Sequence, residues 1–366
     1  MTSERAITQL LGERIAAGDF PSAAFIVGRP DGEILRGALG NACVIPEPIK
    51  ASVNTIYDVA SLTKPLVTAL LTSIAIERHL ISAQQTVGEF LGAAVSAVAN
   101  VTIRQLATHS SGLPAWLPLY LLAETPEQAI AEILKLRPWH INTVVYSDLN
   151  FILLGKILEE AFAMPIDVAA ERLIFLPLGL KNAMFRPRAE LRPRIAASEI
   201  GNRYEAETCR QEFPELAIRN GVFRDYLIWG EVHDANAYFL GGAAGHAGLF
   251  ADADSVFRIA LQFLPETSQI LQPATCSLFT TNFTPAMAEA RSFGFQLALS
   301  EGSTAGPDLS PSSFGHNGFT GTCLWIEPES RRIFVLLTNR THNRPLPFAN
   351  INEVRRRFNS LAAAVA

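Results

Sequence analysis

The sequence predicts an α/β protein of the α+β type, in which one antiparallel sheet flanked by helices is assembled from both ends of the chain. Strand patterns lie near the two termini, whereas the segment from about residue 65 to residue 287 has mostly helical patterning with long, proline-containing loops. The predicted sheet domain therefore comprises residues 1–66 and 288–366. A mainly helical domain, residues 67–287, is inserted between them, and we expect a functional site in the cleft between the two domains.

Each element follows from a local pattern. Near the N-terminus apolar side chains fall on one side of a helix, and two short apolar runs then flank the turn sequence Arg29-Pro30-Asp31-Gly32, which is typical of a β-hairpin. The stretch 186–229 contains two Arg-Pro-Arg triplets and is predicted to be an ordered but irregular loop region. The predicted helices are 4–17 and 350–365, and the predicted strands are 22–28, 33–40, 293–299, 322–326 and 332–339.

Composition excludes several classes of protein. The 366 residues include 30 Lys and Arg against 35 Asp and Glu, so the net charge is −5 and nucleic acid is not an expected partner. Hydrophobic residues make up 49% of the chain and charged residues 18%, which is typical of a folded globular protein rather than a disordered one.

The sequence carries no signal for export, a membrane or a metal. Residues 1–7 lack the basic and apolar regions of a secretory signal, and no run of 18 apolar residues occurs, so we expect a cytosolic location and no membrane partner. The cysteines form no C-x-x-C pair, and we expect neither a metal nor an organic cofactor. These cysteines are Cys43, Cys209, Cys276 and Cys323.

The strongest local motif is Ser61-Leu62-Thr63-Lys64, which precedes an apolar helical pattern. Positions i and i+3 share a helix face, so the Lys64 amine can reach the Ser61 hydroxyl. Main-chain N–H groups and the positive end of the helix dipole would lie beside that serine. The pair is therefore a candidate nucleophile and base, although a serine cap beside a solvated lysine gives the same short pattern.

Two further segments support the chemical interpretation. Tyr146-Ser147-Asp148 stands just before a helical pattern, and a phenol near a Ser–Lys pair can relay protons. Far downstream, His316-Asn317-Gly318-Phe319 precedes an apolar strand, and a glycine-rich strand edge can offer a main-chain N–H to an oxyanion.

The order S-x-x-K, Y-S-[ND], [KH]-x-G resembles the serine hydrolases related to class C β-lactamases, penicillin-binding DD-peptidases and their esterase relatives. The segments 108–114, which reads T-H-S-S-G-L-P, and 230–250 also resemble this family, and the similarity extends from about Tyr57 to Asn339. The resemblance implies the β-lactamase/transpeptidase-like fold.

The resemblance also implies roles for individual residues. Ser61 would be the nucleophile that forms an acyl-enzyme, Lys64 would take its proton, and Tyr146 would pass a proton to the leaving group. The N–H groups of Ser61 and Phe319 would form the oxyanion hole. His316 would replace the lysine of class C β-lactamases. The expected substrate contacts are Asp148, Asn317 and Gly318.

Asp148 stands where many members of that family have asparagine. If the carboxylate faces the substrate, it weakens recognition of an amide carbonyl, because it cannot donate a hydrogen bond. If it pairs with Lys64 instead, it raises the pKa of the lysine and shifts more of the base role to Tyr146.

We therefore expect a serine hydrolase that acts on small esters first, on D-amino-acid peptides or amides second, and on β-lactams third. β-Lactams come last because the sequence carries no export signal and has histidine in place of lysine in the [KH]-x-G triplet. The rival hypothesis is a non-catalytic relative that binds a ligand or builds an assembly. The complete set of Ser61, Lys64, Tyr146 and His316 argues against it.

His233 and His246 lack metal-binding spacing and are expected in one wall of the cleft. The oligomeric state stays open.

Overall fold

A computed structural model describes residues 3–31, 35–92, 96–139, 143–216 and 221–364. Its main feature is an antiparallel seven-stranded sheet with the strand order β3-β2-β1-β10-β9-β8-β7. β1 and β10 are paired from Ala23 with Thr338 to Gly28 with Ile333, which joins the two ends of the chain. The strands are β1 (Ser22–Gly28), β2 (Leu35–Cys43), β3 (Ile49–Lys50), β7 (Gln296–Leu297), β8 (Phe314–Asn317), β9 (Cys323–Glu327) and β10 (Arg332–Thr338).

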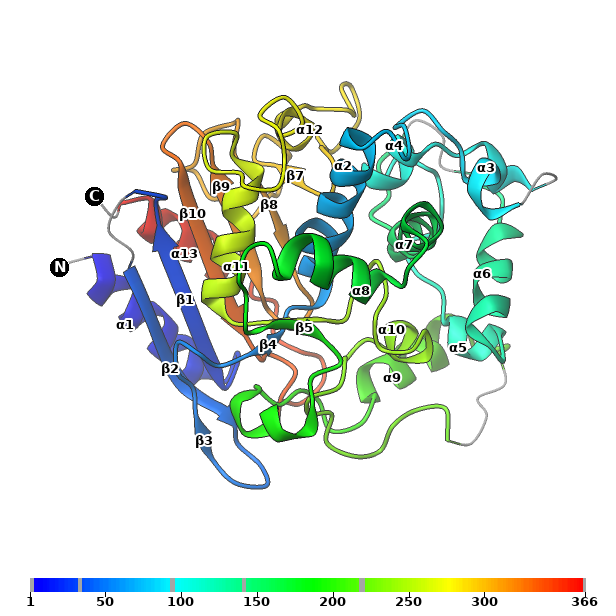
Figure 1. The fold of residues 1–366 in the computed structure, drawn as a ribbon. Helices are drawn as coiled ribbons and strands as arrows, with labels where there is room; N and C mark the ends of the chain where they lie inside the picture. The colour runs from blue at the N-terminus through cyan, green and yellow to red at the C-terminus, as the bar shows by residue number, and fades with distance from the viewer. Residues whose placement is uncertain (1–2, 32–34, 93–95, 140–142, 217–220, 365–366) are drawn as a thin grey trace.

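Both faces of this sheet are covered by helices (Figure 1). The outer face carries α1 (Ser3–Ala17) and α13 (Asn352–Ala363), which pack on each other and on the sheet, and the inner face carries α11 (Ala253–Ala260). Along β1, Phe25 faces the outer core, whereas Ile26 faces the inner one. Because each face is buried, the central strands are apolar at nearly every position.

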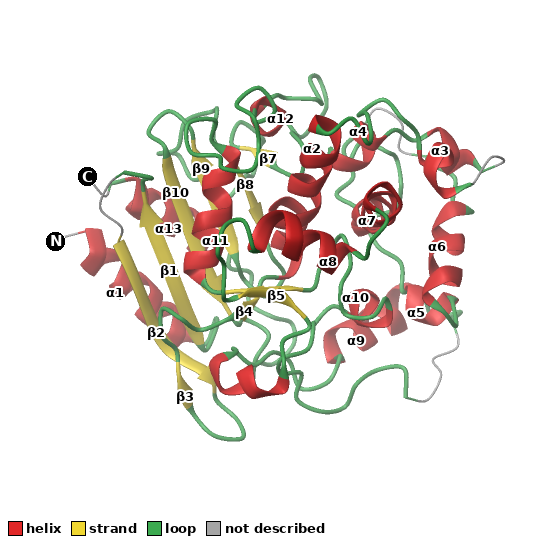
Figure 2. Ribbon diagram, viewed as in Figure 1, coloured by secondary structure: helices red, strands yellow, loops and turns green. Residues whose placement is uncertain are grey.

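Most of the remaining helices lie on the inner side of the sheet (Figure 2). Among them α7 is buried around most of its circumference and forms the centre of this region. The helices are α2 (Leu70–Glu77), α3 (Val87–Leu91), α4 (Ile103–Ala107), α5 (Leu119–Leu122), α6 (Pro126–Leu134), α7 (Asp148–Phe162), α8 (Ile166–Ala170), α9 (Arg203–Glu212), α10 (Ala235–Phe239) and α12 (Ser277–Thr280).

Close packing of the loop before strand β6 (Leu249–Ala251) on α7 depends on glycine at position 245. A Cβ at Gly245 would lie 2.0 Å from the carbonyl oxygen of Phe151 in α7, so no larger residue fits without displacing the main chain. The Gly245 carbonyl also accepts a hydrogen bond of 2.6 Å from Thr68 Oγ1. This contact holds the next residue, His246, close to Lys64.

The predicted sheet and terminal helices are confirmed, with boundaries shifted by a few residues. The predicted strand 33–40 runs to Cys43, and its first residues lie outside the described part of the chain, as does the end of the predicted helix 350–365. The prediction for 293–299 was too long. Only Gln296 and Leu297 pair in β7, because Gly294 has φ +75° and residues 292–295 form a turn.

Two features were not predicted. The stretch expected to be irregular contains α9, whose sequence is so polar that few of its residues face the core. A small three-stranded sheet with the order β4-β6-β5 also forms, from β4 (Tyr57–Asp58), β5 (Ala183–Phe185) and β6 (Leu249–Ala251). Its strands are too short to give a periodic pattern. Among the described residues, none of the helices combines the length and apolar character needed to span a bilayer.

Candidate active site

Ser61 lies in a strained turn directly after β4. Ala60 has φ +50°, a left-handed conformation that costs an alanine on the order of 1–3 kcal/mol. The turn is held from both sides: Asp58 Oδ1 accepts from the Ala60 N–H at 2.8 Å, and Thr63 Oγ1 donates to the Ala60 carbonyl at 2.7 Å. The chain then passes through a single 3₁₀ turn and a wide π-helical turn before α2, rather than the regular helix that the sequence predicted.

This geometry still brings the Lys64 amine to the Ser61 hydroxyl, at 3.0 Å. The lysine side chain is completely buried, and its Nζ lies 2.7 Å from Asp148 Oδ1 and 3.1 Å from the His246 carbonyl oxygen. Burial alone would lower the pKa of this lysine, but the opposing effect of the Asp148 carboxylate and of Tyr146 is larger, and the pKa is raised above its ordinary value. Lys64 is therefore held as an ammonium group.

The structure distinguishes the two alternatives for Asp148. Its carboxylate pairs with Lys64, and its side chain is only 18% exposed. Asp148 also lines the pocket in front of Ser61, so it borders the space for a substrate while its charge is directed to the lysine.

Tyr146 lies at the centre of a group of rings and cations. Its ring centroid is 4.5 Å from that of His109 and 5.7 Å from that of His316. Lys64 Nζ is 5.1 Å from the centroid, and the Arg291 guanidinium is 5.6 Å from it. The phenol ring therefore lies near two cations, Lys64 and Arg291.

His316 is neutral and has a defined tautomer. Its Nδ1–H donates to the Asn317 carbonyl at 2.8 Å, so the lone pair is on Nε2, which is buried without a partner among the described residues. Burial lowers the pKa of His316 well below its usual value, and the charges of Lys64 and Arg291 lower it further. At neutral pH the imidazole is a hydrogen-bond acceptor that faces the Tyr146 side of the pocket.

The segment after His316 is fastened closely against the Ser61 turn. A Cβ at Gly318 would lie 2.6 Å from the Val59 carbonyl oxygen, and Thr322 Oγ1 donates to the same carbonyl at 2.9 Å. Only glycine therefore allows β8 to end so close to Ser61. The Phe319 carbonyl accepts from Arg340 Nε at 3.0 Å, whereas the Phe319 N–H donates no hydrogen bond within the described part of the chain. That N–H is available to an oxyanion.

Asn317 differs from its neighbours in direction. Its amide oxygen accepts from Thr304 Oγ1 at 3.0 Å, on the outer face of the sheet where Trp325 also bonds Thr304. His316, one residue earlier, faces the inner side. A substrate contact from Asn317 would therefore have to come from its main chain.

These groups surround a pocket of about 570 Å³. Of the site residues named from the sequence, all but Lys64 line it, and Lys64 lies behind Ser61. Of the two histidines expected in a wall of the site, His233 lines the pocket and His246 does not. The lining residues include Ala60, Ser61, Trp116, Tyr146, Asp148, Tyr204, Glu205, Glu212, His233, Asp234, Arg291, His316, Asn317, Gly318, Phe319 and Arg340.

Sequence reasoning missed Arg291 and most of an acidic wall of the same pocket, which comprises Glu205, Glu212 and Asp234. Arg291 is 5% exposed, and its Nε and Nη2 donate to the single oxygen Glu289 Oε2, with the Nε contact at 2.8 Å. No hydrogen bond from its Nη1 is present among the described residues, so part of a buried cation faces the pocket. Nothing in the local sequence marks this arginine, because long-range folding alone brings it beside Tyr146.

The acidic wall is built on two histidine–carboxylate pairs. His246 Nε2 is 2.9 Å from Asp234 Oδ1, and His233 Nε2 is 2.9 Å from Glu199 Oε2. The main-chain N–H of His233 donates to Asp58 Oδ2 at 2.7 Å, which connects this wall to the Ser61 turn. No group of three or more His, Cys, Asp or Glu side chains within the described ranges is arranged to hold a metal ion.

Glu205 is the unusual acid of this wall. Burial, followed by the charge of Asp234, raises its pKa from 4.5 to about 7. The folded state therefore binds the proton between pH 4.5 and 7 where the unfolded state does not, and stability falls as the pH rises through this window. Glu205→Gln has no carboxyl group to titrate here, so its stability does not fall for this reason as the pH rises. We expect the unfolding free energy of the variant, relative to wild type, to rise from pH 4.5 to pH 7 and then stay level, measured by urea titration.

The control for this prediction is Glu207→Gln, which removes an exposed acid from the same helix and should follow the wild-type profile. Parallel pH profiles for wild type and Glu205→Gln would contradict the raised pKa.

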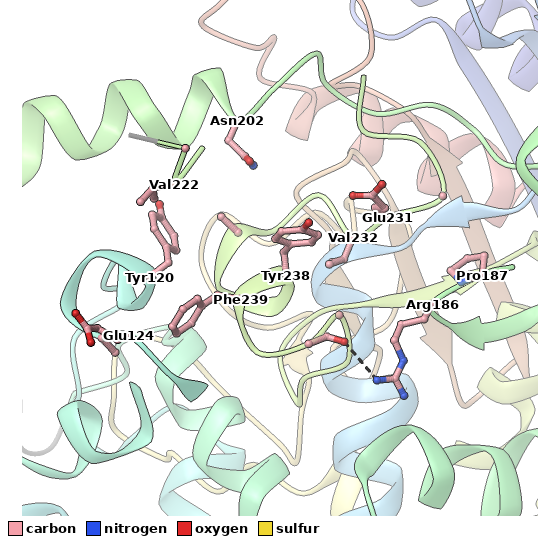
Figure 3. A pocket seen from close by; sticks show the side chains of 16 residues that line it. Tyr120, Glu124, Arg186, Pro187, Asn202, Val222, Glu231, Val232, Tyr238 and Phe239 are labelled. Atoms are coloured by element: carbon pink, nitrogen blue, oxygen red, sulfur yellow. Dashed lines mark hydrogen bonds between the residues drawn. The ribbon is translucent and has the colours of Figure 1, made fainter. Parts of the chain in front are cut away.

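A second and larger hollow, of about 870 Å³, lies on the α5, α9 and α10 side of the molecule. Figure 3 shows its aromatic wall of Tyr120, Tyr238 and Phe239, and Arg186 bonded to the Gly241 carbonyl at the other end. None of the catalytic, oxyanion-hole or substrate-contact residues predicted from the sequence lines it. The candidate active site is therefore the smaller pocket.

Comparison with known proteins agrees with this site and fold. The family model described as Beta-lactamase matches residues 7–356, and the chain belongs to that family. The predicted β-lactamase-like serine hydrolase is thereby confirmed at the level of family, and the protein is an enzyme of this class. The cytosolic location, the domain boundaries and the individual residue roles stay predictions.

Individual relatives are moderately similar. A protein from Salmonella gallinarum, provisionally named D-alanyl-D-alanine carboxypeptidase, is 29% identical over 92% of this chain and 82% of its own. Two solved structures share the fold. One is EstCE1, described as a hydrolase with promiscuous acyltransferase activity, with a TM-score of 0.75 and 19% identity over 99% of both chains. The other is a class C β-lactamase from Rhodobacter sphaeroides, with a TM-score of 0.72 and 18% identity over 99% of this chain and 100% of its own.

Proposed function

We propose that the protein hydrolyses acyl compounds through an acyl-enzyme on Ser61. The observation that carries this proposal is the buried Lys64 amine, 3.0 Å from the hydroxyl of Ser61, which lines a pocket together with Phe319. The ammonium stabilises developing negative charge on Ser61 Oγ, and the Phe319 N–H stabilises the oxyanion of the tetrahedral intermediate.

Protons move through Tyr146 in this scheme. Ser61 Oγ bonds to the acyl carbon, its proton passes to the phenolic oxygen, and the phenol gives its own proton to the leaving group as the acyl bond breaks. Water then attacks the acyl-enzyme and gives a proton to the Tyr146 phenol, which returns its own proton to Ser61 Oγ as the carboxylic acid is released. Tyr146 has this role because Asp148 keeps Lys64 protonated, so the lysine cannot serve as the free base.

Arg291 suggests which substrate class is accepted. Its guanidinium borders the Tyr146 and His316 side of the pocket, where the leaving group must receive its proton. A guanidinium with a free N–H edge is a strong ligand for carboxylate. We therefore place a peptide ending in a free carboxylate, such as a D-alanyl-D-alanine peptide, ahead of the small esters that the sequence favoured. The provisional name of the Salmonella relative supports the same class.

Small esters remain the second candidate because of Asp148. Its carboxylate offers no N–H donor for the carbonyl of a substrate amide, so a peptide loses one recognition contact there. An ester with a good leaving group depends less on that contact. The fold shared with EstCE1 is consistent with this candidate.

Arg291→Gln tests the substrate class. For a peptide with a C-terminal D-alanine carboxylate, we expect kcat/KM to fall by roughly 10–100-fold, because a charge-assisted hydrogen bond of about 1.5–3 kcal/mol is lost. Hydrolysis of p-nitrophenyl butyrate should change little. The measurement is the kcat/KM of both substrates in wild type and variant.

The same peptide with an amidated C-terminus is the matched control, because it should be insensitive to Arg291→Gln. An equal loss on all three substrates would show that Arg291 supports the site in general and does not bind a carboxylate. Hydrolysis of the ester with no peptide turnover by wild type would favour the esterase.

A further inference from the structure

His109 holds the main chain on both sides of Tyr146. Its carbonyl oxygen accepts from the Val145 N–H at 2.9 Å, and its ring Nδ1 accepts from the Ser147 N–H at 3.0 Å. The two bonds flank the tyrosine residue in the chain. Both come from one residue in a loop 37 positions earlier, so the placement of Tyr146 depends on that loop.

The His109 ring also forms the surface against which the tyrosine ring packs. The centroids are 4.5 Å apart with an interplanar angle of 36°, and Phe151 of α7 lies 5.0 Å away from the same imidazole. His109 is 1% exposed. The phenol therefore rests against a buried ring that α7 holds in place.

A second set of contacts fixes His109 itself. Asn150 Nδ2 lies 3.5 Å from His109 Nδ1, and Asn150 Oδ1 accepts from Ser111 Oγ at 2.6 Å. His109 also has φ +56°, the left-handed conformation that a turn after α4 requires. These contacts give a structural role to the histidine and the second serine of the T-H-S-S-G-L-P segment.

His109 does not itself meet a substrate. It is absent from the lining of the pocket, and its Nδ1 lone pair is already used. Burial lowers its pKa well below the usual value, and the charges of Arg291 and Lys64 lower it further, so the ring stays neutral. Any effect of His109 on the reaction must pass through a neighbour.

We infer that His109 is a positioning residue for Tyr146, which fixes both the main chain and the ring plane and so holds the phenol in the pocket that Ser61 also lines. The inference rests on the proton-relay role proposed for Tyr146. A misplacement of a reacting group by about 1 Å can cost on the order of 10²-fold in rate. Loss of the imidazole should therefore reduce kcat far more than it changes KM.

Two variants separate the contacts of His109. His109→Asn tolerates positive φ and keeps an acceptor oxygen near the position of Nδ1, but it removes the ring. His109→Ala removes both. We expect kcat to fall by about 10²-fold in His109→Ala and by less in His109→Asn, with KM nearly unchanged.

A double-mutant cycle with Tyr146→Phe tests whether the effect passes through the phenol. In the Tyr146→Phe background, His109→Ala should have almost no further effect on kcat. A merely structural role would give the same loss in both backgrounds and would overturn the inference. If His109→Ala fails to fold, the cycle is run with His109→Asn, for which the same comparison decides.

The reaction of Ser61 with a fluorophosphonate, followed in each variant, reports the nucleophile independently of the relay. Labelling of Ser61 with wild-type turnover in Tyr146→Phe would overturn this inference and the role of Tyr146 but leave the acyl-enzyme intact. Absence of both labelling and turnover in wild type would overturn the proposed function, and with it this inference.

Discussion

Replacing Ser61 by alanine is expected to lower kcat/KM by roughly 10⁴-fold or more, because a serine hydrolase without its nucleophile retains only the contribution of binding and the oxyanion hole. The fold should persist. Lys64 keeps its contacts with Asp148 and the His246 carbonyl, so the unfolding free energy should change by no more than about 1–2 kcal/mol. The measurement is turnover of the D-alanyl peptide and of p-nitrophenyl butyrate, with urea unfolding alongside.

The control is Ser277→Ala, the same chemical change at an exposed position of α12, which should leave turnover unchanged. If Ser61→Ala retained more than a few per cent of wild-type turnover, the reaction would not use Ser61 as its nucleophile. If Ser61→Ala unfolds, the test is repeated with Ser61→Cys, which replaces the hydroxyl by a thiol of similar size.

Tyr146→Phe is expected to reduce kcat by about 10²–10⁴-fold, the usual contribution of a positioned proton-transfer group. Phenylalanine keeps the ring that packs on His109 and His316, so the change removes the hydroxyl and leaves the packing. The effect should be largest for peptide substrates, whose amine leaving group requires a proton. The measurement is kcat for the peptide and for the nitrophenyl ester.

The ester serves as the internal control, because p-nitrophenolate leaves without protonation and its loss should be smaller. Equal activity of wild type and Tyr146→Phe on the peptide would contradict the relay and return the base role to Lys64. That outcome would also require Lys64 to lose its proton despite its pairing with Asp148.

Much of the fold could be predicted because its strands carry their signal locally. β1 and β10 are buried on both faces, so each appears as an apolar run bounded by turn residues. α9 could not be predicted in this way, since its residues are mostly polar and its role is to place Glu205 at the pocket. The turn at Gly294 also escaped the apolar pattern, because tertiary contacts of Phe293 and Phe295 account for that hydrophobicity.

The candidate site divides in the same way. Ser61 and Lys64 are close in sequence, so their proximity follows from local geometry. The pairing of Lys64 with Asp148 could be stated only as one of two alternatives, because it depends on how α7 packs against the Ser61 segment. Arg291 and Glu205 have no motif around them, and only the folded chain brings them to one pocket.

The most direct test of the account is to identify the covalent intermediate. Incubation with a fluorophosphonate or benzylpenicillin, followed by proteolysis and mass spectrometry, should place one adduct on the peptide that contains Ser61. The adduct should be absent in Ser61→Ala and slower to form when Lys64 is replaced by methionine. An intact protein that turns over a substrate but carries no adduct on Ser61, or carries it on another residue, would contradict the acyl-enzyme mechanism.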